Sequence, residues 1–256
     1  MRLQLLSDLH LETEAFDPEP TPGAELLILA GDVDSGWAGL RRFADWPVPI
    51  LFVPGNHEYD RRDFDAARAG LRRLSDELGF TLLDDSSCIR SDEQGRRVRF
   101  LGSTRWSDFD LFGESQRERA MRAGGYFQRV MAATRDGQSF DAVAVREEAL
   151  RCKAWLTQEL TLGDRGPDWD ATVAITHFAP SLRSADPRYG RQPGTASFCN
   201  NDEDLLGGAR LWLHGHLHCQ HNYRIGDTRV ICNARGHARK GEPAGFEPKI
   251  LIEVFE

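Results

Sequence analysis

The sequence predicts an α/β fold in which short buried strands alternate with amphipathic helices. Two apolar runs, LLILA at 26–30 and ILFV at 50–53, are short and apolar on both faces, as strands of a covered sheet are. Residues 60–78 and 141–160 instead carry apolar side chains at spacings of three and four, which is the helical period. With 256 residues, 40% of them apolar, and a mean hydropathy of −0.48, the chain can bury a large core.

The expected elements follow one another in chain order. A strand at 2–7 precedes LLILA, and a short helix at 35–46 separates LLILA from ILFV. Asp60 can cap the helix at 60–78, and Gly124-Gly125 is expected to interrupt a helix at 115–135. Further strands are expected at 81–83, 98–102, 172–176, 210–214, 229–232 and 249–255. Because strands dominate the second half, the sheet should be partly mixed. No break in composition divides the chain, so we expect one domain, 1–256.

Composition excludes several classes of protein. No apolar run approaches the roughly 20 residues that span a bilayer, and the acid Asp8 comes too early for a signal peptide. Five cysteines without a CxxC spacing argue against a disulfide scaffold and predict a reducing, cytoplasmic compartment. The net charge of −8 argues against a nucleic-acid partner. The oligomeric state stays open.

Polar clusters stand where five of the predicted strands end. They are Asp8-Leu9-His10, Gly31-Asp32, Gly55-Asn56-His57-Glu58, Thr176-His177 and His214-Gly215-His216-Leu217-His218. Each alone is a common turn, and a single histidine such as His177 is more often a satisfied polar residue than a ligand. In α/β sheets, however, ligands bind beyond the carboxyl ends of the strands. Five such clusters after five strands therefore predict one shared site.

The ordered set D-x-H, G-D, G-N-H-E, H, G-H-x-H, from Asp8 to His218, resembles the calcineurin-like metallophosphoesterase superfamily. The resemblance implies an α/β/β/α sandwich of mixed sheets with the helices outside and the site at the strands' carboxyl ends. It also implies two divalent transition metal ions (Mn, Fe or Zn), which imidazole and carboxylate ligands suit. By resemblance, Asp8, His10 and His218 would bind the first metal, Asn56, His177 and His216 the second, and Asp32 would bridge both.

The resemblance gives His57 a different role, beside the metals but not on them, where it can protonate the leaving alkoxide as a general acid. Glu58 or a nearby acid could orient it. Two metals can hold an attacking hydroxide and a phosphoryl oxygen at once. We therefore expect a hydrolase acting on a small phosphate ester, with a phosphodiester, cyclic nucleotides included, as the preferred substrate.

Two alternatives to a phosphodiesterase stay open. A phosphomonoesterase is one, but the protein-phosphatase pattern G-D-x-x-D-R-G is not matched by Gly31-Asp32-Val33-Asp34-Ser35-Gly36, so protein phosphatase activity is disfavoured. A non-catalytic metal-binding scaffold is the other. Scaffolds of this kind normally lose ligands or the acid histidine, and all of these positions are intact here, which favours the enzyme.

Residues outside the motif set give weaker candidates. The segment 104–141 is rich in aromatic residues and could form a helical lid over the substrate, although the same aromatics could instead pack helices onto the sheet. Arg105 and Arg235 are weak candidates for binding a phosphate oxygen. The loop 183–201 could gate access. His214 is expected to pack at its strand end, and His221 and His237 are expected on the surface.

Overall fold

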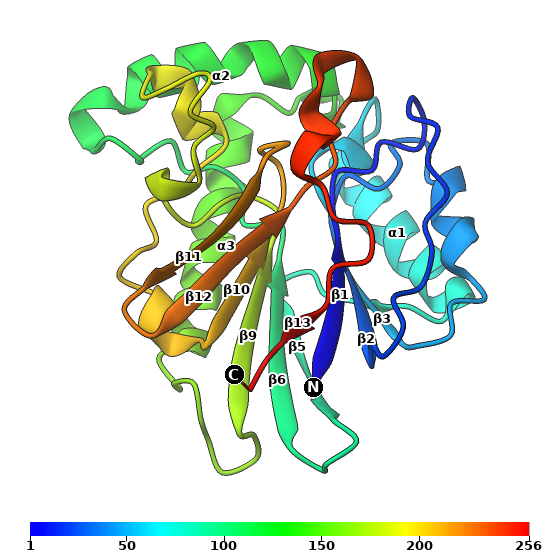
Figure 1. Ribbon diagram of the computed structural model, residues 1–256. Coiled ribbons are helices and arrows are strands. Elements are labelled where there is room, and N and C mark those ends of the chain that lie inside the picture. The colour runs from blue at the N-terminus through cyan, green and yellow to red at the C-terminus, as the bar shows by residue number, and fades with distance from the viewer. Residues whose placement is uncertain (256) are drawn as a thin grey trace.

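Two β-sheets packed face to face form the centre of this computed structural model, which describes residues 1–255, apart from the side chains of 126–128 (Figure 1). The first sheet has the order β13-β1-β2-β3-β4, in which β1 to β4 are parallel and β13 is antiparallel to β1. Its strands are β1 (Arg2–Leu6), β2 (Leu26–Ala30), β3 (Ile50–Val53), β4 (Thr81–Leu82) and β13 (Ile252–Glu253).

The second sheet has the order β11-β12-β10-β9-β6-β5. Its four inner strands are parallel, and the two edge strands are antiparallel to their neighbours. The strands are β5 (Ser86–Ser91), β6 (Arg97–Ser103), β9 (Ala171–Thr176), β10 (Leu211–His214), β11 (Gln220–Ile225) and β12 (Thr228–Asn233). A separate small ribbon pairs β7 (Thr134–Arg135) with β8 (Gln138–Ser139).

Alternating side chains explain why the strands are apolar on both faces. In β2, Leu26, Ile28 and Ala30 join the core between the sheets, whereas Leu27 and Leu29 join a second core on the outer face. Helix α1 (Phe64–Leu78) packs on that outer face through residues such as Leu71. Both faces of the sheet are therefore covered, as the continuous apolar run predicts.

Helix α3 (Ala142–Leu160) covers the outer face of the second sheet, where Leu156 and Leu160 pack with Trp212 of β10. Helix α2 (Arg117–Met131) instead crosses the end of the molecule at the top of Figure 1. The layers are thus helix, sheet, sheet, helix, which confirms the expected α/β/β/α sandwich. None of the helices in the described part of the chain combines the length and apolar character that crossing a membrane requires.

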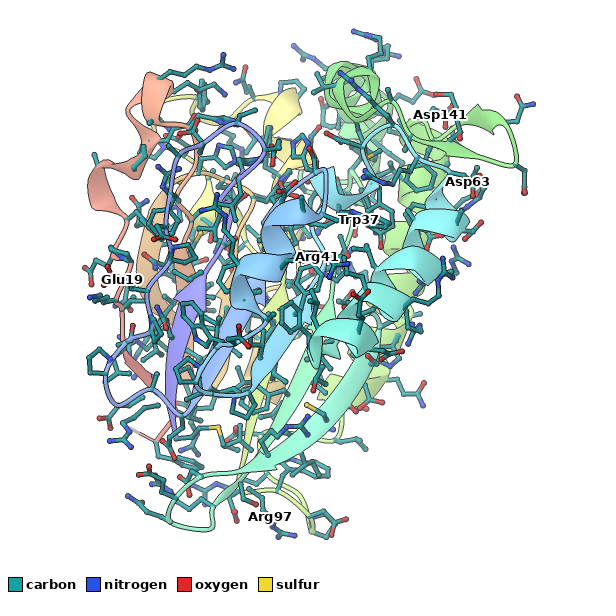
Figure 2. All side chains as sticks on the ribbon, turned by 90° about the vertical axis from the view of Figure 1, so that its right-hand side faces the viewer. Glu19, Trp37, Arg41, Asp63, Arg97 and Asp141 are labelled. Carbon is teal, nitrogen blue, oxygen red and sulfur yellow. The ribbon has the colours of Figure 1, made fainter. Side chains whose placement is uncertain are left out.

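Helix boundaries differ from the sequence prediction in ways that the contacts explain. Helix α1 begins at Phe64, not 60, because the Asp63 side chain accepts a hydrogen bond from the Ala66 N–H at 3.0 Å. Asp141 caps α3 in the same way, and both caps lie at the upper ends of their helices (Figure 2). Helix α2 runs unbroken through Gly124, where a side chain would collide with Phe109.

Two further expected elements differ from the structure, and two edge strands were not expected. The predicted helix at 35–46 is a 3₁₀ helix, η1 (Ala38–Phe43), on the face shown in Figure 2. The predicted strand at 249–255 shortens to β13. The antiparallel edge strands β5 and β11 were missed because polar and half-exposed residues fill them, so they lack an apolar run. All five cysteine thiols are free.

Candidate metal centre

The polar clusters that follow five strands in the sequence meet at one place, beyond the upper ends of the parallel strands in Figure 1. The contributions are Asp8 and His10 after β1, Asp32 after β2, Asn56 after β3, His177 after β9, and His216 and His218 after β10. Contacts within hydrogen-bonding or ligand range link these residues into two adjoining clusters. The structure therefore brings together all seven side chains that the resemblance names as ligands.

The first of these groups, the Asp32 cluster, consists of Asp8, Asp32, His177 and His216, whose potential ligand atoms all lie within 4.8 Å of one another. His177 Nε2 lies 3.2 Å from Asp32 Oδ2 and 3.2 Å from Asn56 Oδ1, which adds the asparagine to the edge of the cluster. The carboxylates of Asp8 and Asp32 are fully buried. This combination of two carboxylates, two imidazoles and an amide oxygen is a donor set for a divalent transition metal.

The second group, the His10 cluster, consists of His10, His218 and His237, with ligand atoms within the same 4.8 Å range. The Nε2 atoms of His10 and His218 lie 3.0 Å apart. Asp8 joins the two clusters, because its Oδ1 atom is 3.4 Å from His218 Nε2. The sequence placed His237 on the surface, but its side chain is only 17% exposed and faces this cluster.

Each predicted histidine ligand has one ring nitrogen in contact with an oxygen acceptor, which leaves the other ring nitrogen for a metal. The partners are Glu12 Oε1 at 3.2 Å for His10, the Ala30 carbonyl at 2.9 Å for His177, the Ser197 carbonyl at 3.1 Å for His216, and Glu242 Oε2 at 2.7 Å for His218. Metal-binding histidines almost always donate their free N–H in this way, which fixes the tautomer and aims the other nitrogen at the metal.

Two local features test whether the site suits a cation. Asp32 Oδ2 is buried and lies 3.2 Å from His177 Nε2 without a well-aligned hydrogen bond, whereas Oδ1 accepts one from the His57 N–H at 2.8 Å. The facing Nε2 atoms of His10 and His218 cannot both be donors to each other. A divalent cation would satisfy the orphaned oxygen and both nitrogens, so the residues fit a metal centre.

Five of the predicted ligands have a left-handed backbone, which is rare for residues other than glycine. Their φ angles are 54° for Asp8, 47° for His10, 52° for Asp32, 71° for His216 and 50° for His218. Such conformations cost of order 1–3 kcal/mol each and persist where the surrounding structure enforces them, most often at functional sites. Each sharp turn lets the chain leave its strand and still point the side chain into the centre.

His57 lies beside the two clusters without belonging to either. Its ring is 5.2 Å from that of His10, and its Nδ1 atom contacts Asp60 Oδ2 at 2.9 Å. Burial opposes protonation, but the charges of Asp32 and Asp60 outweigh it and raise the pKa of His57 to about 10. The acid that contacts the imidazole is therefore Asp60, which the sequence had suggested as a helix cap.

Glu58 holds two of the site's loops together instead of contacting His57. Its fully buried carboxylate accepts hydrogen bonds from the backbone N–H groups of four residues: Asp32 at 2.9 Å, Val33 at 2.8 Å, Asp34 at 3.3 Å and Gly55 at 2.6 Å. Burial and the charge of Asp32 raise the pKa of this carboxyl group to about 7. Glu58 thus ties the loop carrying Asp32 to the loop carrying Asn56.

Buried charges also set the pKa values of the predicted ligands. Burial opposes protonation of His177 and His218, but Asp32 outweighs it for His177 and Asp8 for His218, and the pKa of each rises to about 9. Burial lowers the pKa of His216 to about 3, and nearby His177 adds to the effect. A cation entering the centre must therefore displace protons from His177 and His218.

The two weak candidates for phosphate binding lie in different surroundings. Arg105 is fully buried, and its guanidinium donates to both oxygens of Asp202 and to Asp108. This placement gives Arg105 a structural role in holding the segment after β6. Arg235 lies nearer the centre, and its Nη1 atom is 3.4 Å from Glu14 Oε2.

Other histidines and cysteines near the site in sequence lie outside both clusters. His214 is fully buried and contacts Ser184 Oγ through Nε2 at 2.9 Å. Burial lowers its pKa to about 3. Cys199 is fully buried, and the Cys219 thiol lies 3.1 Å from His221 Nε2. None of these four side chains belongs to the Asp32 cluster or the His10 cluster.

A small pocket lies against the Asp32 cluster, between the loops that follow the strands and the helices α2 and α3. Its wall is mostly apolar and aromatic and includes Asn56 and His216 from the centre; the other lining residues are Trp106, Ser107, Phe109, Gly124, Met131, Val145, Phe178 and Ser197. Several of them belong to 104–141, so this segment both packs into the core and borders the site. Two more aromatic residues of 104–141, Tyr126 and Phe127, have side chains that lie outside the described part of the structure.

A face-to-face sandwich that gathers aspartates and histidines at its strand ends offers the ligand set of a metal-dependent hydrolase. The chain belongs to the calcineurin-like phosphoesterase family, whose sequence model matches residues 1–220. That match spans every predicted ligand from Asp8 to His218. Members of this family typically use a dinuclear metal site, and the two adjoining clusters could hold such a pair.

Individual relatives are distant but match nearly the whole chain. UDP-2,3-diacylglucosamine hydrolase of Stenotrophomonas maltophilia is 24% identical over 90% of this chain and 90% of its own length. An uncharacterised protein of Acanthamoeba polyphaga mimivirus is 22% identical, over 98% of this chain and 96% of its own. The crystal structure of phosphopantetheinyl hydrolase from Mycobacterium tuberculosis has a TM-score of 0.70 at 20% identity, covering 99% of this chain and 95% of that one. This last likeness shows a shared fold.

Proposed function

We propose that the protein hydrolyses a small phosphodiester at a pair of divalent transition metal ions, Mn, Fe or Zn. Asp8, His10 and His218 would hold one ion, Asn56, His177 and His216 the other, and the orphaned oxygen of Asp32 would let this carboxylate bridge them. Bound metal ions supply Lewis acidity and a nucleophilic hydroxide at neutral pH. The chain's own residues supply orientation and proton transfer.

The observation that carries this proposal is the position of His57. The ring lies beside His10, is 26% exposed, and is oriented by Asp60 at 2.9 Å. A protonated imidazole there can give its Nε2 proton to the alkoxide that leaves as the P–O bond breaks. A protein that only stored or displayed metal ions would have no use for an oriented acid at this point.

The ion pairs of the two candidate arginines favour a diester over a monoester. A monoester brings two negative charges at neutral pH and a diester one, so a monoesterase gains more from a free cationic side chain beside its metals. Both candidate arginines are committed, Arg105 to Asp108 and Asp202 and Arg235 to Glu14. Their charges are largely compensated before substrate arrives.

The pocket beside Asn56 and His216, with a volume of about 40 Å³, could admit a small part of one organic substituent of the ester. Trp106, Phe109 and Phe178 line it, and aromatic walls bind rings or alkyl groups. Ser197 Oγ, also in the wall, is buried without a hydrogen-bond partner and could bind a polar atom of that substituent. The segment 104–141 would then act as the lid over the substrate.

A metal-reconstituted substrate panel tests the proposal. Protein loaded separately with Mn²⁺, Fe²⁺ or Zn²⁺ is assayed on bis(p-nitrophenyl) phosphate, p-nitrophenyl phosphate, and 2′,3′- and 3′,5′-cyclic nucleotides. We expect the diesters to be cleaved faster than the monoester, and the activity to be lost with chelator and in Asp32→Ala. Faster cleavage of the monoester would establish a phosphomonoesterase instead, and no turnover with any metal would favour the scaffold alternative.

A further inference from the structure

The segment that follows β12 folds over the His10 cluster. Its backbone is attached to the loop after β1, because the Arg235 N–H donates to the Ser7 carbonyl and the Gly236 N–H donates to the Asp8 carbonyl, both at 3.0 Å. Gly236 has a φ of 67°, and a Cβ atom there would lie 2.7 Å from His218 Cβ. The chain thus approaches the centre closely just before His237.

His237 packs its ring against both other members of the cluster. The ring centroids of His237 and His10 are 4.5 Å apart with an interplanar angle of 28°, and those of His237 and His218 are 5.2 Å apart. One ring nitrogen of each histidine lies within 4.8 Å of one in each of the others. This is a spacing at which three imidazoles can share one ion.

The three histidines share a further feature, a carboxylate on Nδ1. The contacts are Glu12 at 3.2 Å for His10, Glu242 at 2.7 Å for His218, and Glu14 at 3.2 Å for His237. Glu14 is itself fixed by the Ala238 N–H at 3.1 Å. A carboxylate on one ring nitrogen is the usual partner of a metal-binding histidine, and it leaves Nε2 as the ligand atom.

We propose that His237 is an additional nitrogen ligand of the metal ion held by His10 and His218, a role that rests on the metal centre proposed above. The ion at this position would then have three imidazoles and the Asp8 and Asp32 carboxylates, a nitrogen-rich set that favours Zn²⁺ or Fe²⁺ over Mn²⁺. The alternative is that His237 only fastens the segment 234–242 to Glu14. The two roles differ in one consequence: metal binding depends directly on the His237 imidazole only if His237 is a ligand.

Metal titration without substrate separates these roles. Metal-free wild type, His237→Ala and His237→Gln are titrated with Zn²⁺ by calorimetry, and bound zinc is counted by elemental analysis. Cobalt(II) absorption spectra then report the ligand set. We expect His237→Ala to keep two sites but to weaken one by at least about tenfold and to change the cobalt spectrum. His237→Gln, which can still bond to Glu14, should weaken the same site.

His221→Ala serves as the matched control, since His221 is a half-buried histidine outside both clusters. It should bind zinc as the wild type does. Unchanged zinc affinities and cobalt spectra in both His237 variants would overturn the inference, and circular dichroism identifies any variant that fails to fold. If the wild type itself binds no metal, the proposed function fails; if only the His237 variants are unaffected, this inference fails alone.

Discussion

Replacing Glu58 by glutamine should destabilise the protein and weaken metal binding, although Glu58 is not a predicted ligand. Oε2 of the carboxylate accepts from the N–H groups of Asp32 and Gly55, and Oε1 accepts from those of Val33 and Asp34. An amide has only one carbonyl oxygen. Whichever way its side chain turns, glutamine therefore presents an NH₂ group to two buried N–H donors.

The size of the loss follows from these contacts. Each buried donor left without an acceptor costs about 1–3 kcal/mol, so two cost about 2–6 kcal/mol. The amide should turn its NH₂ toward Val33 and Asp34, because the Asp34 bond is the longest at 3.3 Å. We therefore expect Glu58→Gln to lower the free energy of unfolding by about 2–4 kcal/mol, in the lower part of that range.

Urea unfolding of the metal-loaded proteins at pH 8 measures this loss. That pH lies above the pKa of about 7 of Glu58, so the wild-type carboxylate is ionised. Glu77→Gln is the control, since Glu77 is 58% exposed and pairs with Arg41 at the surface, and it should change stability by less than about 1 kcal/mol. If Glu58→Gln unfolds at the same urea concentration as the control, the carboxylate does not hold the two loops together.

Three more predictions concern the centre and its support. His57→Ala should retain both metal ions, as counted by elemental analysis, while its kcat falls by about 10²- to 10⁴-fold. The fall should be largest for esters with poor leaving groups. Loss of metal from this variant would show that His57 is a ligand. Arg105→Met should lower the free energy of unfolding, measured with urea, by about 3 kcal/mol, the low end for a broken buried ion pair. The loss is at the low end because Lys153 lies 3.5 Å from Asp108 and can partly compensate its charge. A variant of normal stability with a raised KM would show instead that Arg105 binds substrate. Zinc affinity should rise with pH up to about 9. The pKa values of His177 and His218 are raised to about 9, and each imidazole must lose a proton before it binds the metal. Titrations that give the same zinc affinity at pH 6.5 and pH 8.5 would contradict this prediction.

The sequence could predict the ligand-bearing strands because each is a buried apolar run followed at once by polar residues. LLILA and ILFV form β2 and β3 with the expected bounds, and their ends place Asp32 and Asn56 at the centre. The sequence did not predict the position of His237, although this residue also follows a buried strand, β12. It follows β12 at a distance of four residues, and only the turn at Gly236 brings its ring back to His10.

Other roles depended on contacts between residues far apart in the chain. Arg105 was considered for phosphate binding because it stands after a strand, but its partner Asp202 is 97 residues away, and no local pattern shows the pairing. Asp60 and Glu58 are both acids near His57, and only the three-dimensional arrangement shows that Asp60 contacts the imidazole while Glu58 binds backbone N–H groups. The spacing of residues along the chain can identify the functional side chains of one loop, but it does not show which distant residue each of them contacts.

The two sheets contribute unequally to the centre, and this has a mechanical consequence. Four predicted ligands come from loops of the first sheet, Asp8, His10, Asp32 and Asn56, and three come from loops of the second, His177, His216 and His218. A metal ion bound by side chains from both sheets would act as a cross-link between them at this end of the sandwich. Metal loss should then let the two sheets separate first at that end, so that hydrogen exchange in the loops after β1 and β10 would accelerate while the opposite end of each strand stays protected.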